Sequence, residues 1–112
     1  MRPEVVTATY NVLVRRAQKR DVVTYSGLSS MIPGLPVRGP AMIDTLIAVN
    51  ARSWAEKGVL LPVLVVNAGK NGLPSSGFYE SLAHYRPNDD QSDLAKAARR
   101  ERERVYAAYP TD

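Results

Sequence analysis

The feature that most restricts the fold of this chain is a block of eight residues, Pro33-Gly-Leu-Pro-Val-Arg-Gly-Pro40, which contains three prolines and two glycines. Proline removes a backbone donor from a helix interior, and glycine favours the backbone conformation at which many helices end. The block is too short to link two domains, and apolar residues recur at helical spacing on both sides of it. We therefore expect two helices joined by a turn inside one domain, which suits a length of 112 residues.

Two helices are expected before this block. The first begins at Pro3, where a missing N–H does no harm, and ends in a cluster of four basic residues over positions 15–20. The helix dipole favours cations at a C-terminus, so helix termination explains this cluster as well as contact with phosphate does. The second helix is short, over residues 27–32, and either Thr24 or Ser26 is expected to cap it.

The helix after the block is longer. It is expected to begin at Pro40 and to end at Gly58, because glycine suits the left-handed conformation that follows many helices. One amphipathic stripe at helical spacing, of the kind that normally meets the core, consists of Ile43, Leu46, Ile47, Asn50 and Trp54. The other positions offer few side chains that recognise DNA bases, among them Met42, Asp44, Thr45, Ala48, Ala51 and Arg52.

A strand and a wing are expected next. Residues 60–66 are continuously apolar and rich in β-branched side chains, which favours a strand, and Pro62 places its beginning at a sheet edge. Asn71-Gly72 is a favoured tight-turn pair, and residues 73–79 can return as the second strand of a hairpin over 63–78. A helix-turn-helix followed by such a hairpin has the order of elements of a winged helix.

The last third of the chain is expected to be helical. A short helix over residues 79–85 precedes a polar loop at 87–92, where Ser92 is suited to cap a second helix over 94–109. The charges over 96–104 alternate in sign, which is typical of a solvated helix face.

Few residues offer catalytic chemistry. The chain has no cysteine, which excludes a disulfide scaffold, a thiolate nucleophile and cysteine-based metal centres. With one histidine, His84, a transition-metal site would need a carboxylate cluster that the sequence does not contain. Ser75-Ser76-Gly77 is like an oxyanion loop without its His and Asp partners, and Asp89-Asp90 suits a turn. We expect no catalytic residues, metal ions or cofactors; a hydrolase or nuclease that uses these few groups is the remaining alternative.

The charge balance favours an anionic partner. Lysine and arginine number 15 against 11 acidic residues, so the net charge is +4 and the isoelectric point is about 9.6. Five residues are candidate contacts to a nucleic-acid backbone: Tyr25, Ser26, Arg38, Lys70 and Asn71. Arg38 precedes a helix N-terminus, and Lys70 and Asn71 occupy the expected wing tip. Structural explanations compete, since Tyr25 suits a packed aromatic, Arg38 a turn residue and Lys70 a solubilising charge.

Three segments resemble a known DNA-binding family. They are Val23-Thr24-Tyr25-Ser26-Gly27-Leu28-Ser29, Leu61-Pro62-Val63-Leu64-Val65-Val66, and Gly72 with Gly77-Phe78. In this order, around a turn and a helix, they resemble the C-terminal winged-helix domain of the O6-alkylguanine-DNA alkyltransferases and the related alkyltransferase-like proteins. The resemblance covers residues 22–78 and implies a winged helix that binds DNA.

The sequence departs from that family where the family's chemistry is located. Pro62-Val63-Leu64-Val65 stands where the family has a Pro-Cys-His-Arg active site, so this chain has no group to accept an alkyl substituent. The arginine that enters the duplex in the family corresponds to Pro40, two positions from Arg38. The resemblance therefore implies the scaffold without alkyl transfer.

A second likeness, over nearly the whole chain, is to small bacterial and phage proteins. It is carried by Tyr25-Ser-Gly-Leu28, Arg38-Gly39, Pro62-Val-Leu64-Val-Val66, Gly72-Leu-Pro74-Ser-Ser-Gly77-Phe78-Tyr79 and Glu101-Arg-Glu103-Arg-Val105-Tyr106. This likeness implies a bacterial or phage setting and no particular activity.

Together these features predict one α+β domain over residues 1–112, a winged helix-turn-helix type with four or five helices and a small hairpin or short sheet. Helices with the helix-turn-helix occupy 3–58, the strand and wing 60–78, and the last helices 79–109. We expect a non-catalytic cytoplasmic protein that binds nucleic acid, DNA above all, through its phosphates with low sequence specificity. The long helix and the hairpin would then share a positive outer edge. No segment resembles a signal peptide or a membrane span.

The alternative function is a protein-interaction module, such as a phage-encoded inhibitor of a host protein. The long helix is not basic, and four aromatic residues are candidate exposed anchors for a partner: Trp54, Tyr79, Tyr85 and Tyr109.

Overall fold

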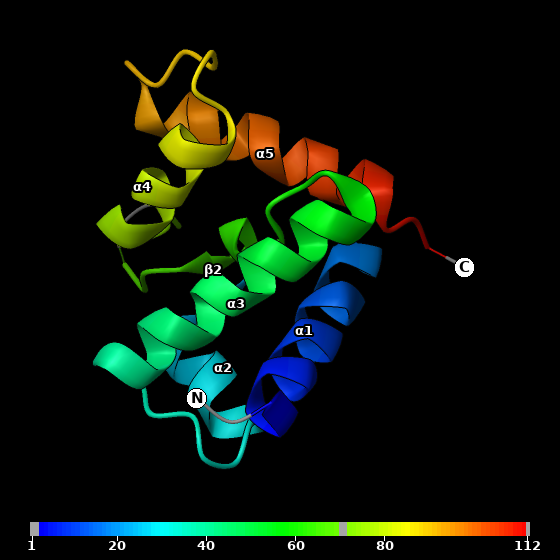
Figure 1. The fold of residues 1–112 in the computed structure, drawn as a ribbon, viewed down its shortest axis with the longest axis vertical. Coiled ribbons are helices and arrows are strands. Elements are labelled where there is room, and N and C mark those ends of the chain that lie inside the picture. The colour runs from blue at the N-terminus through cyan, green and yellow to red at the C-terminus, as the bar shows by residue number, and fades with distance from the viewer. Residues whose placement is uncertain (1–2, 70–71, 112) are drawn as a thin grey trace.

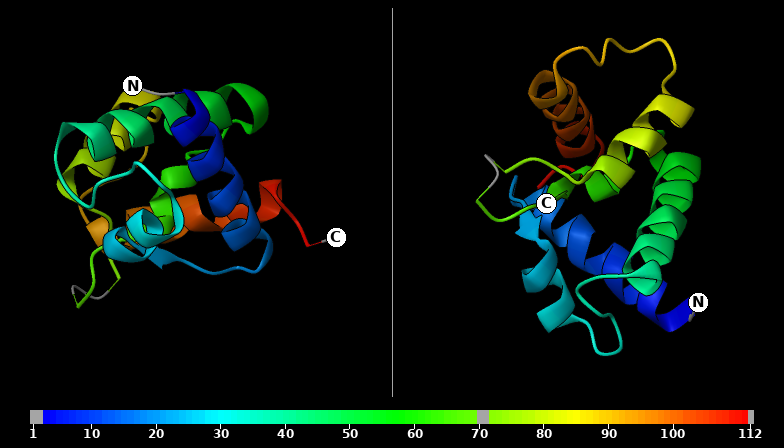
Figure 2. Two further views of the ribbon diagram at one scale, coloured as in Figure 1. Left: turned by 90° about the horizontal axis from the view of Figure 1, so that it is seen from below. Right: turned by 90° about the vertical axis from the view of Figure 1, so that its left-hand side faces the viewer.

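In the computed structural model, which describes residues 3–69 and 72–111, five α-helices pack around a short buried segment (Figure 1). In chain order the elements are α1 (Pro3–Gln18), β1 (Val23–Thr24), α2 (Tyr25–Met31), α3 (Pro40–Lys57), the 3₁₀ helix η1 (Leu61–Leu64), β2 (Val65–Val66), α4 (Ser76–Tyr85) and α5 (Leu94–Ala108). The buried segment is η1 with its neighbours, and it contacts α1, α3 and α5. The loop from α2 to α3 and the loop from α4 to α5 lie at opposite ends of the molecule (Figure 2).

The two long helices expected in the first half are confirmed. α1 covers most of the expected first helix, and α3 begins at Pro40. Gly58 follows α3 in the left-handed region with φ 67°, and its N–H donates to the Trp54 carbonyl oxygen at 2.9 Å. The proline and glycine signals therefore set the ends of α3 as local chemistry predicts.

The N-terminal caps of α2 and α5 agree only in part with the caps that the sequence predicts. Thr24 Oγ1 accepts a hydrogen bond from the backbone N–H three residues later at 3.0 Å, so Thr24 rather than Ser26 caps α2. As a result α2 begins two residues earlier than expected. The prediction that Ser92 caps the last helix is wrong. The Asp93 carboxylate accepts a hydrogen bond from the Lys96 N–H at 3.1 Å and caps α5 instead. A carboxylate at this position also benefits from the helix dipole.

The strand expected over residues 60–66 is mostly wrong. Its centre is the 3₁₀ helix η1, and only Val65–Val66 is a strand. Pro62 lies in the first turn of η1, where its missing N–H does no harm. Because the whole segment is buried, its continuous apolar character does not distinguish a strand from a helix.

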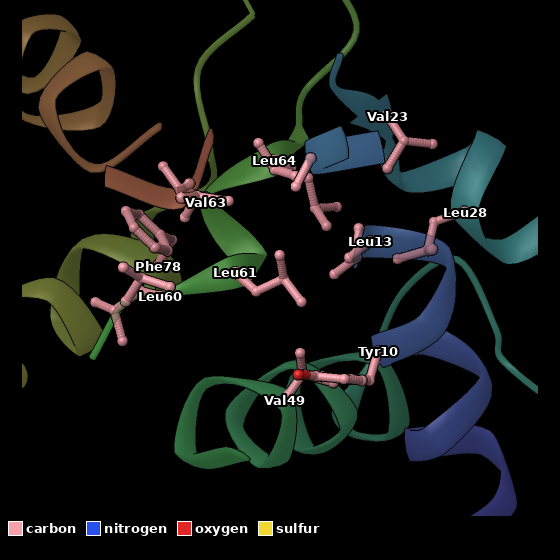
Figure 3. Packing of buried hydrophobic residues seen from close by; sticks show 14 of the residues in the cluster. Tyr10, Leu13, Val23, Leu28, Val49, Leu60, Leu61, Val63, Leu64 and Phe78 are labelled. Atoms are coloured by element: carbon pink, nitrogen blue, oxygen red, sulfur yellow. The ribbon is translucent and has the colours of Figure 1, made fainter. Parts of the chain in front are cut away.

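Side chains supply hydrogen bonds that a sheet would otherwise give this segment. The Leu61 N–H donates to Ser53 Oγ at 3.1 Å, and the Ser53 hydroxyl donates to the Val59 carbonyl oxygen at 2.8 Å. Figure 3 shows Leu61 pointing into the core toward Leu13 of α1 and Val49 of α3. A small polar residue on α3 thus satisfies the backbone while letting α3 approach η1 closely.

The wing hairpin expected over residues 63–78 is also wrong. β2 pairs with β1 in a parallel sheet of two strands, in which Val23 is opposite Val65. Instead of returning as a strand, the chain begins α4 after Ser75, whose backbone is extended and whose carbonyl oxygen accepts the N–H three residues later. Ser75 thus has the backbone of a helix N-cap, a role that serine favours. The described residues form an α+β domain with five helices and a short parallel sheet, and they contain no hairpin.

The charged run on α5 is not solvated throughout, because Glu101 is 0% exposed. Its carboxylate accepts hydrogen bonds from the Leu60 N–H at 2.9 Å, from Arg86 Nε at 2.6 Å and from Arg104 Nη1 at 2.8 Å. Arg86 Nη2 also donates to the Gly58 carbonyl oxygen at 2.8 Å. One carboxylate therefore joins α5 to the end of α4 and to the chain that follows α3.

A second polar cluster joins α1, α3 and α5. Tyr10 donates a hydrogen bond to Glu56 Oε2 at 2.5 Å, and its hydroxyl oxygen lies 3.1 Å from that of Tyr109. Burial and the hydrogen bond to Glu56 raise the pKa of Tyr10 well above its ordinary value. Tyr109 is buried in this cluster, so the expectation that it is an exposed anchor is wrong.

Replacing Glu101 by alanine is expected to lower the free energy of unfolding by about 3–5 kcal/mol, because two arginines and one backbone N–H lose their buried acceptor. Chemical denaturation measures this loss. Glu103→Ala is the matched control, since Glu103 is exposed on the same helix, 3.8 Å from Arg20, and should contribute less than about 1 kcal/mol. Equal losses for the two variants would contradict the role given to Glu101.

Candidate functional site

An apolar groove with a volume of about 290 Å³ lies between α3 and α4. Its apolar lining consists of Met42, Ile43, Leu46 and Ile47 of α3, Pro62 of η1 and Phe78 of α4. Its polar lining consists of Tyr25, Asn50, Ser75, Glu80, Ser81 and His84. We call it the α3–α4 groove.

The groove exists because α3 turns an apolar edge away from the core. Ile43 is 56% exposed and Ile47 is 52% exposed, although both belong to the stripe expected to meet the core. The buried face of α3 includes the small polar residues Thr45 and Ser53 on either side of Val49, and Ser53 bonds to η1. These short side chains bring α3 close to η1, and the two isoleucines are left at the groove.

Tyr25 links α2 to the start of α4 at the groove. Its hydroxyl donates to Ser75 Oγ at 2.8 Å and accepts from the Ser75 N–H at 3.3 Å. Because Ser75 directly precedes α4, this pair fixes where α4 begins relative to α2. The hydroxyl that was expected to contact phosphate is therefore engaged within the protein.

Asn50 is the polar side chain of the groove that the fold leaves incomplete. It is 3% exposed, and its Oδ1 atom has no hydrogen-bond partner in the part of the chain that the structure describes. A buried amide oxygen without a donor costs about 1–3 kcal/mol, and such atoms are rare in folded proteins. In the sequence, Asn50 is recognisable as a polar residue within the apolar stripe of α3.

The groove carries little charge. None of its described lining residues is lysine or arginine, and Glu80 supplies a carboxylate. Asp44 is exposed on α3 beside Ile43, which adds a second negative charge near the same surface. This groove therefore suits a neutral or cationic occupant better than a phosphate.

Among the described residues, no hydrogen bond or ion pair joins Arg38 to the other residues expected to contact nucleic acid. Ser26 is exposed in the first turn of α2, with its Oγ 3.4 Å from Thr24 Oγ1. Arg38 is exposed in the loop before α3, and no ion pair or hydrogen bond joins it to Tyr25 or Ser26 in the described ranges. Lys70 and Asn71 lie outside the described residues.

A basic surface is found on α5 instead. Lys96, Arg99, Arg100 and Arg104 line a shallow depression together with Glu103. Two of these arginines are held by Asp89, 2.8 Å from Arg104 and 4.0 Å from Arg100. The hydrogen bond from Arg104 holds the pKa of Asp89 below its usual value. Lys96 and Arg99 are exposed, one turn apart, and we call these four basic residues the α5 basic surface.

Three of the four aromatic residues proposed as partner anchors are only half-buried, and they make contacts within the protein. Trp54 packs against Tyr85 with ring centroids 5.1 Å apart, and the Arg86 guanidinium lies 4.8 Å from the Trp54 ring centroid. The Tyr79 hydroxyl donates to the Leu94 carbonyl oxygen at 3.1 Å. Their contacts tie α4 to α3 and α5.

Comparison with protein-family models, with curated proteins and with solved structures finds no match to this chain. The described residues include no group of three or more His, Asp or Glu side chains arranged to bind a metal ion. Within the same ranges, no helix combines the length and apolar character needed to cross a membrane. The alkyltransferase-like resemblance stays a prediction.

Asn50→Leu is expected to raise the free energy of unfolding by about 1 kcal/mol, because leucine has a similar shape and leaves no buried amide oxygen without a donor. Thermal and chemical denaturation measure the change. Ser53→Ala, on the same helix, should have the opposite effect, since Ser53 bonds the backbone on both sides of Leu60. A loss of stability in Asn50→Leu would mean that the amide is satisfied within the fold.

Proposed function

We propose that this protein is an interaction module that binds an apolar side chain of a partner protein in the α3–α4 groove. The observation that carries the proposal is the exposure of Ile43 and Ile47 beside a groove of about 290 Å³. Apolar side chains clustered at a concave surface are typical of protein interaction sites. Covering the exposed parts of both isoleucines would contribute about 2–3 kcal/mol to binding.

The charges near α3 favour this function over DNA binding at the same surface. Phosphate contacts need lysine or arginine, whereas Glu80 lines the groove and Asp44 is exposed next to the lining residue Ile43. The outward residues Ile43 and Ile47 lack the donors and acceptors that read base edges. A partner protein that inserts an apolar side chain brings no phosphate groups to this surface, so the carboxylates do not repel it.

Peptide selection tests the proposal directly. A displayed library of random peptides is selected on the wild-type protein, and Ile47→Asp serves as the blocked variant, because a carboxylate at the groove opposes apolar burial. We expect selected peptides to bind Ile47→Asp at least about tenfold more weakly than wild type, measured by titration calorimetry.

Ala55→Asp is the matched control for this experiment. Ala55 is exposed on the same helix and does not line the groove, so the added charge should leave peptide affinity within about twofold of wild type. Selection of no peptide, or of peptides that bind both variants equally, would overturn the proposal.

Nucleic-acid binding is a second proposal, and the α5 basic surface is the observation that favours it. Lys96 and Arg99 are exposed there and form no ion pair with another described residue. Basic side chains one turn apart on a helix suit contact with a phosphate backbone. The contact we propose is therefore on α5 rather than at the α2–α3 turn.

Gel shifts on random duplex DNA across a salt series test this second proposal. Removing two phosphate contacts in Lys96→Ala/Arg99→Ala should reduce the slope of log affinity against log salt by about 1.8. Arg38→Ala is the matched single-charge comparison and should change the slope by less than about 0.5. If Arg38→Ala changes the slope more than the double variant does, the α2–α3 turn rather than α5 contacts the DNA. If wild type gives no gel shift even at low salt, the protein does not bind DNA and the second proposal is wrong.

A further inference from the structure

We infer that Arg20, at the C-terminal end of α1, contacts a DNA phosphate and extends the α5 basic surface onto a second helix. This inference rests on the second proposed function, DNA binding through α5, and names a further residue for it. Two independent observations carry it: the place of the Arg20 side chain beside α5, and the backbone conformation of Arg20.

The Arg20 side chain continues the row of exposed cations on α5. Lys96, Arg99 and Glu103 are spaced by three and four residues, so they lie on one face of α5, and all three line the same shallow depression. Arg20 Nη1 lies 3.8 Å from Glu103 Oε2, and its guanidinium is 5.5 Å from the centre of the Tyr106 ring. Figure 1 shows the C-terminal end of α1 meeting the last turns of α5 at this place.

The length of this row suits a strand of duplex DNA that runs along α5. Lys96 and Glu103 are seven residues apart, which corresponds to about 10 Å along the helix axis. One strand of B-DNA presents a phosphate about every 3.4 Å along its axis, so about three phosphates pass this length. Lys96, Arg99 and Arg20 supply one exposed cation for each of them.

Contacts within the protein hold the Arg20 side chain only weakly. The side chains of Arg20 and Glu103 are 64% and 66% exposed, and an ion pair between such exposed groups contributes little to stability. Glu103 is also the only carboxylate among the described residues that line the depression. The neighbouring carboxylate of Asp21 is engaged by Arg16 at 3.2 Å. A phosphate can therefore draw Arg20 away from Glu103 with little loss of stability.

The backbone conformation of Arg20 is unfavourable for an arginine. Its φ of 53° lies in the left-handed region, and no other non-glycine residue among those described has a positive φ. This conformation ends α1, because the Arg20 N–H donates to the Ala17 carbonyl oxygen at 3.0 Å and the Asp21 N–H donates to that of Arg16 at 2.9 Å. Glycine is the usual residue at such a position, as Gly58 is after α3. Folding alone thus favours glycine at position 20, and the arginine there points to a use of its side chain.

Three substitutions of Arg20 test the inference in gel shifts on random duplex DNA across a salt series. Arg20→Gly should reduce the slope of log affinity against log salt by about 0.9, the value for one lost phosphate contact. Arg20→Met should reduce it equally, because methionine keeps an apolar chain beside Tyr106 and loses only the charge. Arg20→Lys keeps a cation and should stay within about 0.3 of the wild-type slope.

Arg38→Gly is the matched control for Arg20→Gly. It removes the same charge from the loop before α3, which lies at the end of the molecule away from α5, and should change the slope by less than about 0.5. Glu103→Gln removes the carboxylate beside Arg20 and should tighten DNA binding about two- to fivefold at low salt. Asp44→Asn, at the start of α3, should change the affinity by less than about twofold.

Thermal unfolding tests the backbone argument separately from binding. Arg20→Gly should melt at the wild-type temperature or up to about 5 °C above it, because glycine adopts the left-handed conformation without strain. A melting temperature more than about 5 °C below that of wild type would assign the arginine to folding and contradict the inference.

The slopes distinguish this inference from the function on which it rests. If Lys96→Ala/Arg99→Ala reduces the slope by about 1.8 while Arg20→Met leaves it unchanged, DNA contacts α5 alone and the inference about Arg20 is wrong. The inference is also wrong if Arg20→Lys reduces the slope as much as Arg20→Met, because the charge would then not matter. If wild type gives no gel shift at low salt, the inference and the second proposal are both wrong.

Discussion

The structure depends on the neutralisation of one fully buried carboxylate. Glu101 has no exposed surface, and an isolated charge there would strongly destabilise the fold. It is tolerated because Arg86, Arg104 and the Leu60 N–H all donate to it. These donors come from three separate parts of the chain, so the carboxylate forms its full set of bonds only when α5, the end of α4 and the segment after α3 are in place together.

The same interaction explains why a groove exists between α3 and α4. Arg86 directly follows α4 and, through Glu101 and the Gly58 carbonyl oxygen, holds that end of the helix to the end of α3. The hydrogen bonds between Tyr25 and Ser75 hold the other end of α4 to α2. With α4 fixed at both ends, its middle faces the exposed isoleucines of α3 without filling the space. A groove fixed in this way has little ordering left to lose on binding, which favours affinity.

The sequence predicts the features of this fold that are local. Pro40 and Gly58 bound α3 correctly, and Thr24 caps α2, because each acts through its own backbone or its immediate neighbours. The strand and hairpin expected over 60–78 failed because the partner of β2 is β1, which is distant in sequence, and a fully apolar run carries no period. The alternating charges of α5 predict a solvated face that includes Glu101, because two of its three donors, Arg86 and the Leu60 N–H, lie 15 and 41 positions away. In the groove, the sequence points to Tyr25 through its hydroxyl. The exposure of Ile47 follows instead from the packing of α3 on η1 through Ser53, a contact that no local pattern shows.

Asn50 and Glu101 are both buried polar residues, and the difference between them separates folding from function. Every oxygen of Glu101 has a donor, so the fold itself accounts for that residue. Asn50 Oδ1 has none among the described residues, so the fold gives that buried side chain no such account. An uncompensated polar atom lowers stability, and folded proteins keep few of them away from sites of function. Asn50 also lines the groove beside the exposed Ile47, so an unpaired buried polar atom and uncovered apolar surface belong to the same stretch of α3.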